Sequence, residues 1–284
     1  MKKLLTLLLT VCLLFSFGCS SQQTNDSGLI KDGVFTIAME CSYSPYNWAQ
    51  ADDSNGAVKI KDSNDYVNGY DIMIAKMICQ EYGWQLEVVR SDWDSLVPAV
   101  QSRRIDAAIA GQSMTAERSL AVDFAGPYYY ATFAILVKKD SNLVNATSIN
   151  DFSGMKGTAQ MSTIWYTDCL PQMSGVEILT PSESASAMLM ALETNKCDFV
   201  VTDLPTATSA LKVYDDFYLL DFTNTAGDFQ FSQQEREENV NIGISVCKGN
   251  TALLTAINNV LSKMTVEDFN ELMEKAILIA PTGE

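Results

Sequence analysis

The sequence predicts an α/β fold made of two units in succession, because two stretches of the chain each alternate strand-like with helix-like segments. The first stretch begins at residue 34 and alternates strand, helix, strand, helix, strand. The second follows a long apolar strand at 131–139 and continues to a strand at 241–246. Such alternation is typical of a mostly parallel sheet covered by helices. The length of 284 residues allows one large or two medium domains.

The first unit opens with a predicted buried strand, "VFTIAM" (34–39), and a helix, "DIMIAKMICQEYG". Asp71 is expected at the N-cap of this helix, and Gly83 is expected to end it. The strand "WQLEVV", the helix in "SDWDSLVPAVQS" and the strand "IDAAIAG" follow. In the next segment, "GQSMTAER", Thr115 is expected to cap a helix that carries Arg118 in its first turn.

The second unit contains "MKGTAQ", "VEILT" and "CDFVVTD" as strands and "TIWYTDCL" and "SASAMLMALETN" as helices. A further helix is predicted after Pro205. Two amphipathic helices close the chain, the second with a capping box at Thr265. Ligands bind beyond the carboxyl ends of strands in such folds, and "GQSMTAER", "QMST" and Asp203 stand at such ends.

The N-terminus is typical of an exported protein. A positive start is followed by "LLTLLLTVCLLFSF", an apolar run too short to span a bilayer comfortably, so residues 1–18 are predicted to be a signal peptide. Gly18 before Cys19 resembles a bacterial lipobox, which implies that Cys19 carries a lipid and holds the protein at the outer face of the cell membrane. The alternative is a plain secretory signal cut nearby. Residues 19–33 are polar and small and are expected to form a flexible tether.

Charge and residue types exclude several function classes. Without Lys2 and Lys3 the formal charge is 17 − 35 = −18, so the chain would be repelled by nucleic acid and by anionic lipid. The chain has no histidine, which excludes Ser-His-Asp and Cys-His catalysis and disfavours a transition-metal site. No nucleotide-binding motif occurs. We therefore predict no catalytic residue, no metal and no cofactor.

The cysteines give no disulfide framework. Cys12 lies in the predicted signal peptide and Cys19 is the predicted lipid site. The other five are widely spaced, odd in number and without a CxxC pair, so we expect buried free thiols: Cys41, Cys79, Cys169, Cys197 and Cys247.

Six motifs occur in an order and spacing that resembles the extracellular solute-binding proteins of amino-acid ABC transporters. They cover nearly all of residues 34–280: "YSPYNW" (family pattern Y-x-P-F), "NGYDIMIAKMI", "DWDSLVPAVQSRRIDAAIAGQSMTAERSLAVDFAGPYY", "DFSGMKGTAQMST", "CDFVVTD" and "GISVCKGNTALLTAIN". The fourth motif departs from the family pattern at Gly157, where an apolar residue is usual, and at Ser162, where glycine is usual.

The resemblance implies a two-lobed periplasmic-binding-protein-like fold of type II, with two mixed sheets flanked by helices and two crossing strands as the hinge. Lobe 1 is expected to comprise 34–131 and 248–284, and lobe 2 to comprise 132–247. The implied function is to bind a free amino acid in the cleft and to deliver it, as a monomer, to a permease and its ATPase.

The resemblance also implies a role for each residue of the cleft. Arg118 would grip the ligand's carboxylate with its planar fork of donors, and the helix N-terminus behind it would attract the same anion. Thr163 would add a hydroxyl and an N–H from the opposite lobe. The structural alternatives are a surface ion pair for Arg118 and an ordinary N-cap for Thr163.

Asp203 would take the ligand's ammonium, helped by the carbonyl of Gly111 and the hydroxyl of Ser113. Its structural alternative is to cap the helix that follows.

The ligand's side chain would lie between Tyr43 and Trp93, with Glu40 at its far end. Two aromatic faces and a carboxylate suit a basic or polar side chain, and an aromatic side chain is the second choice. The alternatives are core packing for the two rings and a solvated rim position for Glu40.

Two other functions remain open. One is an enzyme on the same fold, such as a dehydratase, with Glu40 as the only obvious acid or base. The other is a ligand sensor that docks on a receptor. The polar segment at 49–68 is longer than the family's usual hairpin, and the sequence does not fix whether it covers the cleft.

Overall fold

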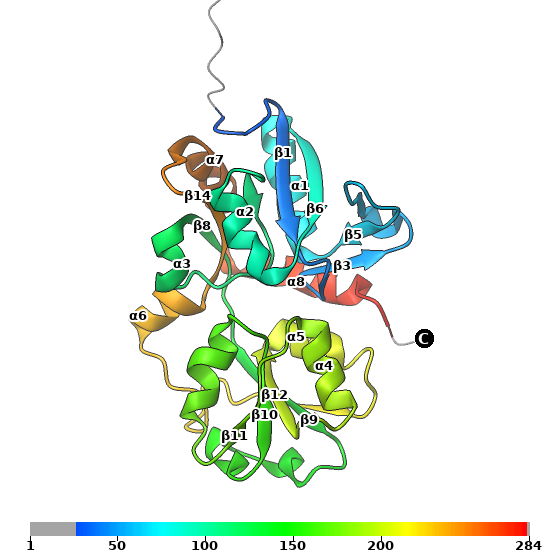
Figure 1. Ribbon diagram of the computed structural model, residues 1–284, viewed down its shortest axis with the longest axis vertical. Helices are drawn as coiled ribbons and strands as arrows, with labels where there is room; N and C mark the ends of the chain where they lie inside the picture. Colours follow the sequence, from blue (N-terminus) through cyan, green and yellow to red (C-terminus); the bar gives the residue numbers. More distant parts are fainter. Residues whose placement is uncertain (1–26, 283–284) are drawn as a thin grey trace, which may run out of the picture.

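The computed structural model describes residues 27–282, so the predicted signal peptide and Cys19 lie outside the described residues. The described chain forms two α/β lobes, which lie one above the other in Figure 1. We call the upper unit, which contains residues 34–129, lobe 1, and the lower unit, which contains residues 133–220, lobe 2. Within residues 27–282 no helix has the length and apolar character needed to cross a membrane.

Lobe 1 is built on a mixed five-stranded sheet. Its strands are β1 (Val34–Met39), β6 (Gln85–Arg90), β7 (Ala107–Ala108), β8 (Val122–Tyr129) and β14 (Ile242–Cys247). In the order β6-β1-β7-β14-β8, β1 is parallel to β6 and β7, while β14 is antiparallel to β7 and β8. The interior strand β1 is an almost unbroken apolar run because helices cover both faces of the sheet.

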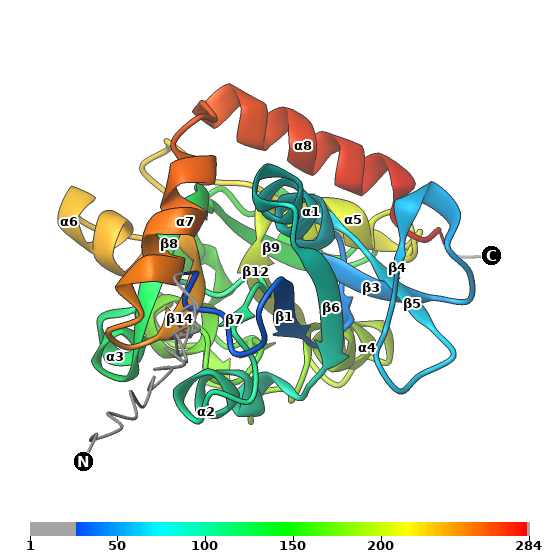
Figure 2. The same cartoon turned by 90° about the horizontal axis from the view of Figure 1, so that it is seen from above.

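The helices of lobe 1 hold this sheet on both sides. They are α1 (Tyr70–Tyr82), α2 (Leu96–Gln101), α3 (Ala116–Ala121), α7 (Thr251–Leu261) and α8 (Val266–Ile279). Figure 2 shows α1 and α8 on one face of the sheet and α2 on the other. The predicted caps at Thr115 and Thr265 are confirmed, since each side chain accepts from the backbone N–H three residues later.

Asp71 does not cap α1, and this prediction was wrong. Gly69 occupies the N-cap, and Asp71 lies inside the first turn with no exposed surface. Its carboxylate accepts hydrogen bonds from the Tyr128 hydroxyl at 2.7 Å and from Asn47 Nδ2 at 2.8 Å. Burial raises the pKa of Asp71 to about 7, and these two donors oppose the rise.

The polar segment at 49–68 belongs to a small antiparallel sheet on lobe 1. Its strands, in the order β2-β3-β5-β4, are β2 (Ser42–Tyr43), β3 (Asn47–Gln50), β5 (Tyr66–Asn68) and β4 (Val58–Lys59). A bridge between Ile60 and Val88 ties this sheet to the edge strand β6.

Lobe 2 repeats the mixed five-stranded plan. Its strands are β9 (Phe133–Lys138), β10 (Lys156–Thr158), β11 (Glu177–Ile178), β12 (Phe199–Asp203) and β13 (Phe217–Leu220), in the order β11-β10-β12-β9-β13. Helices α4 (Ala185–Glu193) and α5 (Leu204–Ala210) lie at its upper side, toward lobe 1 (Figure 1). Gly157 is packed beneath Phe199, because a Cβ there would lie 2.2 Å from the Phe199 ring.

The chain passes from lobe 1 to lobe 2 between β8 and β9, and it returns through a segment that includes the short helix α6 (Gln233–Glu235). The return comes earlier than predicted. Residues 242–247 were expected in lobe 2, but they form β14, which pairs with β7 and β8 of lobe 1. An apolar sequence pattern indicates that a strand is buried, but it does not indicate to which of the two sheets the strand belongs.

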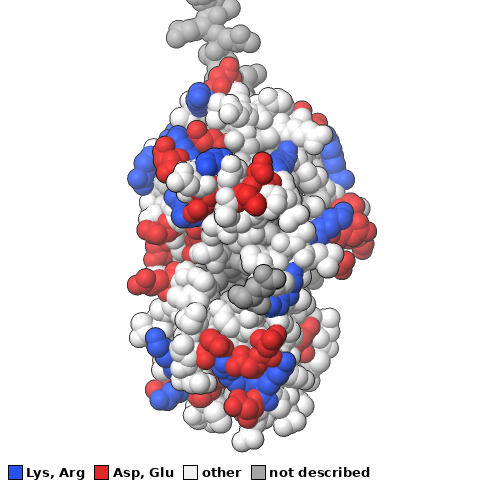
Figure 3. All heavy atoms as spheres, turned by 90° about the vertical axis from the view of Figure 1, so that its right-hand side faces the viewer, with Lys and Arg blue, Asp and Glu red and all other residues white. Residues whose placement is uncertain are grey.

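The described cysteines are all free. Four are buried as predicted, while Cys247 is half-buried. Figure 3 shows acidic side chains grouped on both lobes of the face it presents, with basic side chains among them.

A lysine joins the lobes beside helix α5. Lys212 of lobe 2 donates to the carbonyls of Ile277, Leu278 and Ala280, at 2.7, 3.0 and 3.0 Å. These carbonyls lie at the C-terminus of α8, where helix carbonyls lack intrahelical partners and a cation is favourable. Lys212 therefore ties lobe 2 to the last helix of lobe 1.

Candidate functional site

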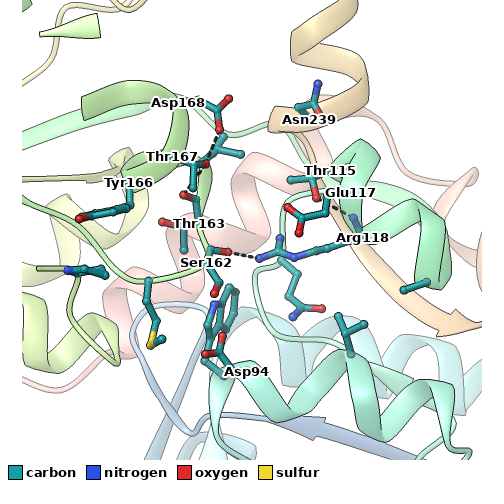
Figure 4. A pocket seen from close by; sticks show the side chains of 17 residues that line it. Asp94, Thr115, Glu117, Arg118, Ser162, Thr163, Tyr166, Thr167, Asp168 and Asn239 are labelled. Carbon is teal, nitrogen blue, oxygen red and sulfur yellow. Dashed lines mark hydrogen bonds between the residues drawn. The ribbon is translucent and has the colours of Figure 1, made fainter. Parts of the chain in front are cut away.

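Arg118 extends from α3 of lobe 1 toward lobe 2 (Figure 4). Its backbone N–H donates to Thr115 Oγ1, which fixes the start of the helix. Nη1 donates to the carbonyl of Ser113 at 2.7 Å, and Nη2 donates to the carbonyl of Ser162 at 2.6 Å. Ser162 belongs to lobe 2, so the guanidinium bridges the two lobes.

The charge of Arg118 has no carboxylate partner within ion-pair distance among residues 27–282. Its guanidinium carbon lies 5.3 Å from the centre of the Trp93 ring. Burial lowers the pKa of Arg118 to about 10, while Glu117 and Asp94 act in the opposite direction. The group stays protonated at neutral pH. A guanidinium has five N–H donors, and the two carbonyls use two of them.

Ser162 and Thr163 form the wall of lobe 2 opposite Arg118. Ser162 has φ of +55°, a left-handed conformation that glycine adopts without strain and serine resists. Thr163 stands directly before a helical segment, as predicted, but its hydroxyl donates to the carbonyl of Gln160 at 2.7 Å instead of capping.

Asp203 is fully buried at the end of β12 and the start of α5. Oδ1 accepts from the Thr206 N–H at 2.9 Å, so the predicted N-cap is present. Oδ2 accepts from the hydroxyl of Thr206 at 2.9 Å and from the hydroxyl of Tyr43, in lobe 1, at 2.6 Å. Burial raises the pKa of Asp203, and these donors oppose the rise.

Glu40 forms another contact between the lobes. It follows β1, is 8% exposed, and accepts from Gln160 Nε2 at 3.1 Å. Burial raises the pKa of Glu40 to about 7; Gln160 opposes the rise, and the charges of Asp92 and Asp94 add to it. Glu40 is thus a buried acid and not a solvated rim residue.

Gly111 and Ser113 lie beside these groups. Gly111 has φ of +64°, and a Cβ there would lie 2.8 Å from the ring of Tyr43. Its N–H donates to the hydroxyl of Tyr128 at 3.0 Å. Ser113 is buried, and its carbonyl accepts the hydrogen bond from Arg118.

Two cavities open between the lobes. One of about 760 Å³ is lined by Arg118, Trp93 and Thr163, and by Asp94, Ser162 and Asn239 among others (Figure 4). The other, of about 540 Å³, is lined by Glu40, Trp93, Arg90, Asp92, Asp94 and Glu183 among others. Trp93, Asp94 and Met161 line both.

The eight predicted ligand-binding residues therefore do not surround a single cavity. Arg118, Thr163 and Trp93 line the first, and Glu40 and Trp93 line the second. The other four are buried and line neither of these two cavities: Tyr43, Gly111, Ser113 and Asp203. No residue at 49–68 lines either cavity.

Sequence reasoning did not single out Gln160, which carries the contact to Glu40. A signal was present, because Gln160 is the last residue of the predicted strand "MKGTAQ" and the first residue of "QMST", which was expected at a ligand-binding strand end. No group of three or more His, Cys, Asp or Glu side chains in the described part of the chain is placed to hold a metal ion.

Comparison with known proteins identifies the fold and the family. The arginine-binding extracellular protein ArtP of Bacillus subtilis is 30% identical over 58% of each chain, so the match spans just over half of that relative. The L-cystine-binding protein TcyJ of Escherichia coli is 25% identical over 87% of this chain and 85% of its own. The amino-acid ABC transporter substrate-binding protein AbpA of Streptococcus pneumoniae, solved with L-arginine, superposes with a TM-score of 0.70 at 25% identity, over 87% of this chain and 95% of that chain.

These likenesses confirm the predicted two-lobed fold of type II, and the relatives are binding proteins and not enzymes. The family model for bacterial extracellular solute-binding proteins, family 3, matches residues 35–278. The chain belongs to this family of extracytoplasmic solute-binding proteins.

Proposed function

We propose that this chain is the binding component of an ABC importer, and that it holds one free amino acid between its lobes and delivers it to a permease. The observation that supports this most strongly is Arg118, a cation at the lobe interface with no carboxylate partner among the described residues. A buried or half-buried charge without a counter-ion is costly, and a ligand's carboxylate would supply one.

The carboxylate end of the ligand would lie in the larger cavity. Two of the five N–H donors of the Arg118 guanidinium bond the carbonyls of Ser113 and Ser162. The other three are enough to bind a carboxylate in bidentate fashion. Thr163 lines the same cavity from lobe 2. Binding there would strengthen an existing contact between the lobes.

The ammonium end would lie against Asp203 and the carbonyl of Gly111. Tyr43 now donates to the Asp203 carboxylate, so the ligand's ammonium would displace or join that hydroxyl. Displacement would free the ring of Tyr43 to stack on the ligand's side chain.

The side chain is proposed to be basic or polar. The smaller cavity carries four acids, Glu40, Asp92, Asp94 and Glu183, against one base, Arg90. An acidic cavity attracts a cation, and Trp93 offers an aromatic face to it. Relatives named for binding arginine agree with this chemistry.

A thermal-shift screen of the twenty amino acids and cystine tests the proposal, because a ligand that binds only the folded state raises the melting temperature. We expect a basic or polar amino acid to give the largest rise, and agmatine, which lacks the carboxylate, to give little. No rise with any of these compounds would overturn the proposal.

The proposed anchor is a lipid on Cys19, outside the described residues. Mass spectrometry of membrane-bound protein is expected to find a lipid adduct at Cys19, and Cys19→Ser is expected to release the protein. A wild-type protein that carries no lipid, or a variant that stays bound to the membrane, would contradict the lipid anchor. Neither result would bear on the proposed binding site.

A further inference from the structure

Tyr46 has a buried hydroxyl that nothing in the described chain satisfies. Tyr46 has no exposed surface, and its hydroxyl has no hydrogen-bond partner among residues 27–282. Its neighbours differ. The hydroxyl of Tyr43 donates to Asp203, that of Tyr70 donates to the carbonyl of Tyr128, and that of Tyr128 donates to Asp71. Burying a hydroxyl without a partner costs free energy, so this group stands out from an otherwise paired cluster.

Tyr46 lies beside the groups proposed to hold the ligand's ammonium. Its ring stacks on Tyr43 with centroids 4.9 Å apart and planes at 28°. It also packs on Gly111, since a Cβ at Gly111 would lie 3.1 Å from Tyr46 Cγ. Burial raises the pKa of the Tyr46 hydroxyl far above its usual value, and the charge of nearby Asp203 raises it further.

We propose that the hydroxyl of Tyr46 accepts a hydrogen bond from the α-ammonium of the bound amino acid; this rests on the proposed function. An ammonium has three N–H donors. Asp203 and the Gly111 carbonyl would take two of them, and Tyr46 would take the third. The hydroxyl of Ser113 was also expected at the ammonium, and it would share the third N–H with Tyr46 as a second acceptor, since its carbonyl already accepts from Arg118.

The sequence agrees that this hydroxyl is a special feature of the chain. "YSPYNW" resembles the family segment Y-x-P-F, in which phenylalanine stands where this chain has Tyr46. A phenylalanine ring could make the same stacking contacts with Tyr43 and Gly111. Packing therefore does not require the hydroxyl, which leaves it available to accept a hydrogen bond from a ligand.

The test is Tyr46→Phe, measured by calorimetry with L-arginine and with δ-guanidinovalerate, which keeps the carboxylate and guanidinium and lacks the ammonium. If the thermal-shift screen selects another amino acid, that compound and its des-amino analogue are used. We expect the affinity for the amino acid to fall about tenfold or more, as for a hydrogen bond to a charged group. Affinity for the analogue should change less than about twofold, since it makes no such bond.

The melting temperature of the unliganded variant separates this role from a structural one. Removing an unpartnered hydroxyl should leave the melting temperature unchanged or raise it. The matched control is Tyr70→Phe, which removes a buried hydroxyl that has a partner. It should lower the melting temperature and leave the affinity within about threefold of wild type.

Two results would overturn the inference while leaving the proposed function intact. One is unchanged amino-acid affinity in Tyr46→Phe. The other is an equal loss for the amino acid and its des-amino analogue, which would place the hydroxyl away from the ammonium. If wild-type protein bound no amino acid at all, the proposed function and this inference would fail together.

Discussion

The two charged groups proposed to hold the ligand, Arg118 and Asp203, are held in different ways. Arg118 is half-buried, contacts only backbone carbonyls and a ring, and keeps donors to spare. Asp203 is fully buried, caps a helix, and accepts from the hydroxyls of Tyr43 and Thr206 and, at 3.5 Å, of Thr202. Among residues 27–282 the cation has no counter-charge, which a ligand would supply in the proposed complex, whereas the anion already has hydrogen-bond donors from the protein. We expect the two ends to contribute unequally to affinity and to stability.

The largest expected effect is that of Arg118→Ala. Loss of the guanidinium would strand the ligand's carboxylate in the cleft, so affinity should fall by about 2–5 kcal/mol. Calorimetry with the amino acid selected by thermal shift measures this. Unfolding by urea serves as the control and should show little change. A loss of affinity below about fivefold would remove Arg118 from the site.

Asp203→Asn should have the second largest effect. The substitution removes the charge that would attract the ammonium, so affinity should fall by about 1.5–3 kcal/mol. Asparagine caps helices as well as aspartate does, so the free energy of unfolding should change by only about 0.5 kcal/mol. Asp203→Ala should add the loss of the cap, about 1 kcal/mol. Unchanged affinity in the asparagine variant would leave Asp203 with the capping role alone.

Glu40 should give a pH dependence of stability. Its pKa is 4.5 in the unfolded chain and about 7 in the folded protein, so the folded state binds more protons between these pH values. The free energy of unfolding should therefore fall as the pH rises from about 4.5 to about 7, by at most about 3 kcal/mol from this group. Buried Asp71 adds a fall of the same sign.

Glu40→Gln isolates the contribution of this side chain. The variant should lose part of the pH dependence and keep the part due to Asp71, as measured by urea unfolding at several pH values. If the free energy of unfolding depended on pH identically in wild type and variant, the raised pKa of Glu40 in the folded protein would be contradicted.

Lys212→Met should weaken the binding of every ligand by a similar factor, whichever charged groups the ligand carries. Lys212 ties the lobes away from Arg118 and Asp203, so its loss should favour the open form and lower affinity by about 0.5–1.5 kcal/mol for every ligand. Lys196→Met, an exposed site of lobe 2, is the matched control. Equal affinity in the two variants would show that Lys212 does not hold the lobes together.

Ser162→Gly should have the smallest effect. Glycine relieves the left-handed backbone conformation of Ser162 and keeps the carbonyl that accepts from Arg118. The free energy of unfolding should rise by up to about 1 kcal/mol, with affinity within about twofold of wild type. A loss of stability would mean that the serine side chain makes a contact worth more than the strain.

The sequence predicts the elements better than it predicts their contacts. Arg118 and Asp203 were singled out because Asp203 ends a strand and Arg118 lies in the first turn of the helix that follows one, each inside a recognisable motif. The bond between Tyr43 and Asp203 joins residues 160 positions apart, and no local pattern encodes it. Asp71 was misplaced for a similar reason, since its partners Tyr128 and Asn47 come from other elements.

Strand 242–247 shows the same limit at the level of the fold. Its apolar run marks a buried strand equally well in either sheet. Only the pairing with β7 and β8 assigns it to lobe 1.

A crystal structure with the bound amino acid tests the central claim most directly. The account predicts both carboxylate oxygens within about 3 Å of Arg118 nitrogens and the ammonium within about 3 Å of an Asp203 oxygen. A ligand that contacts neither side chain, or one held with its carboxylate toward Asp203, would contradict it.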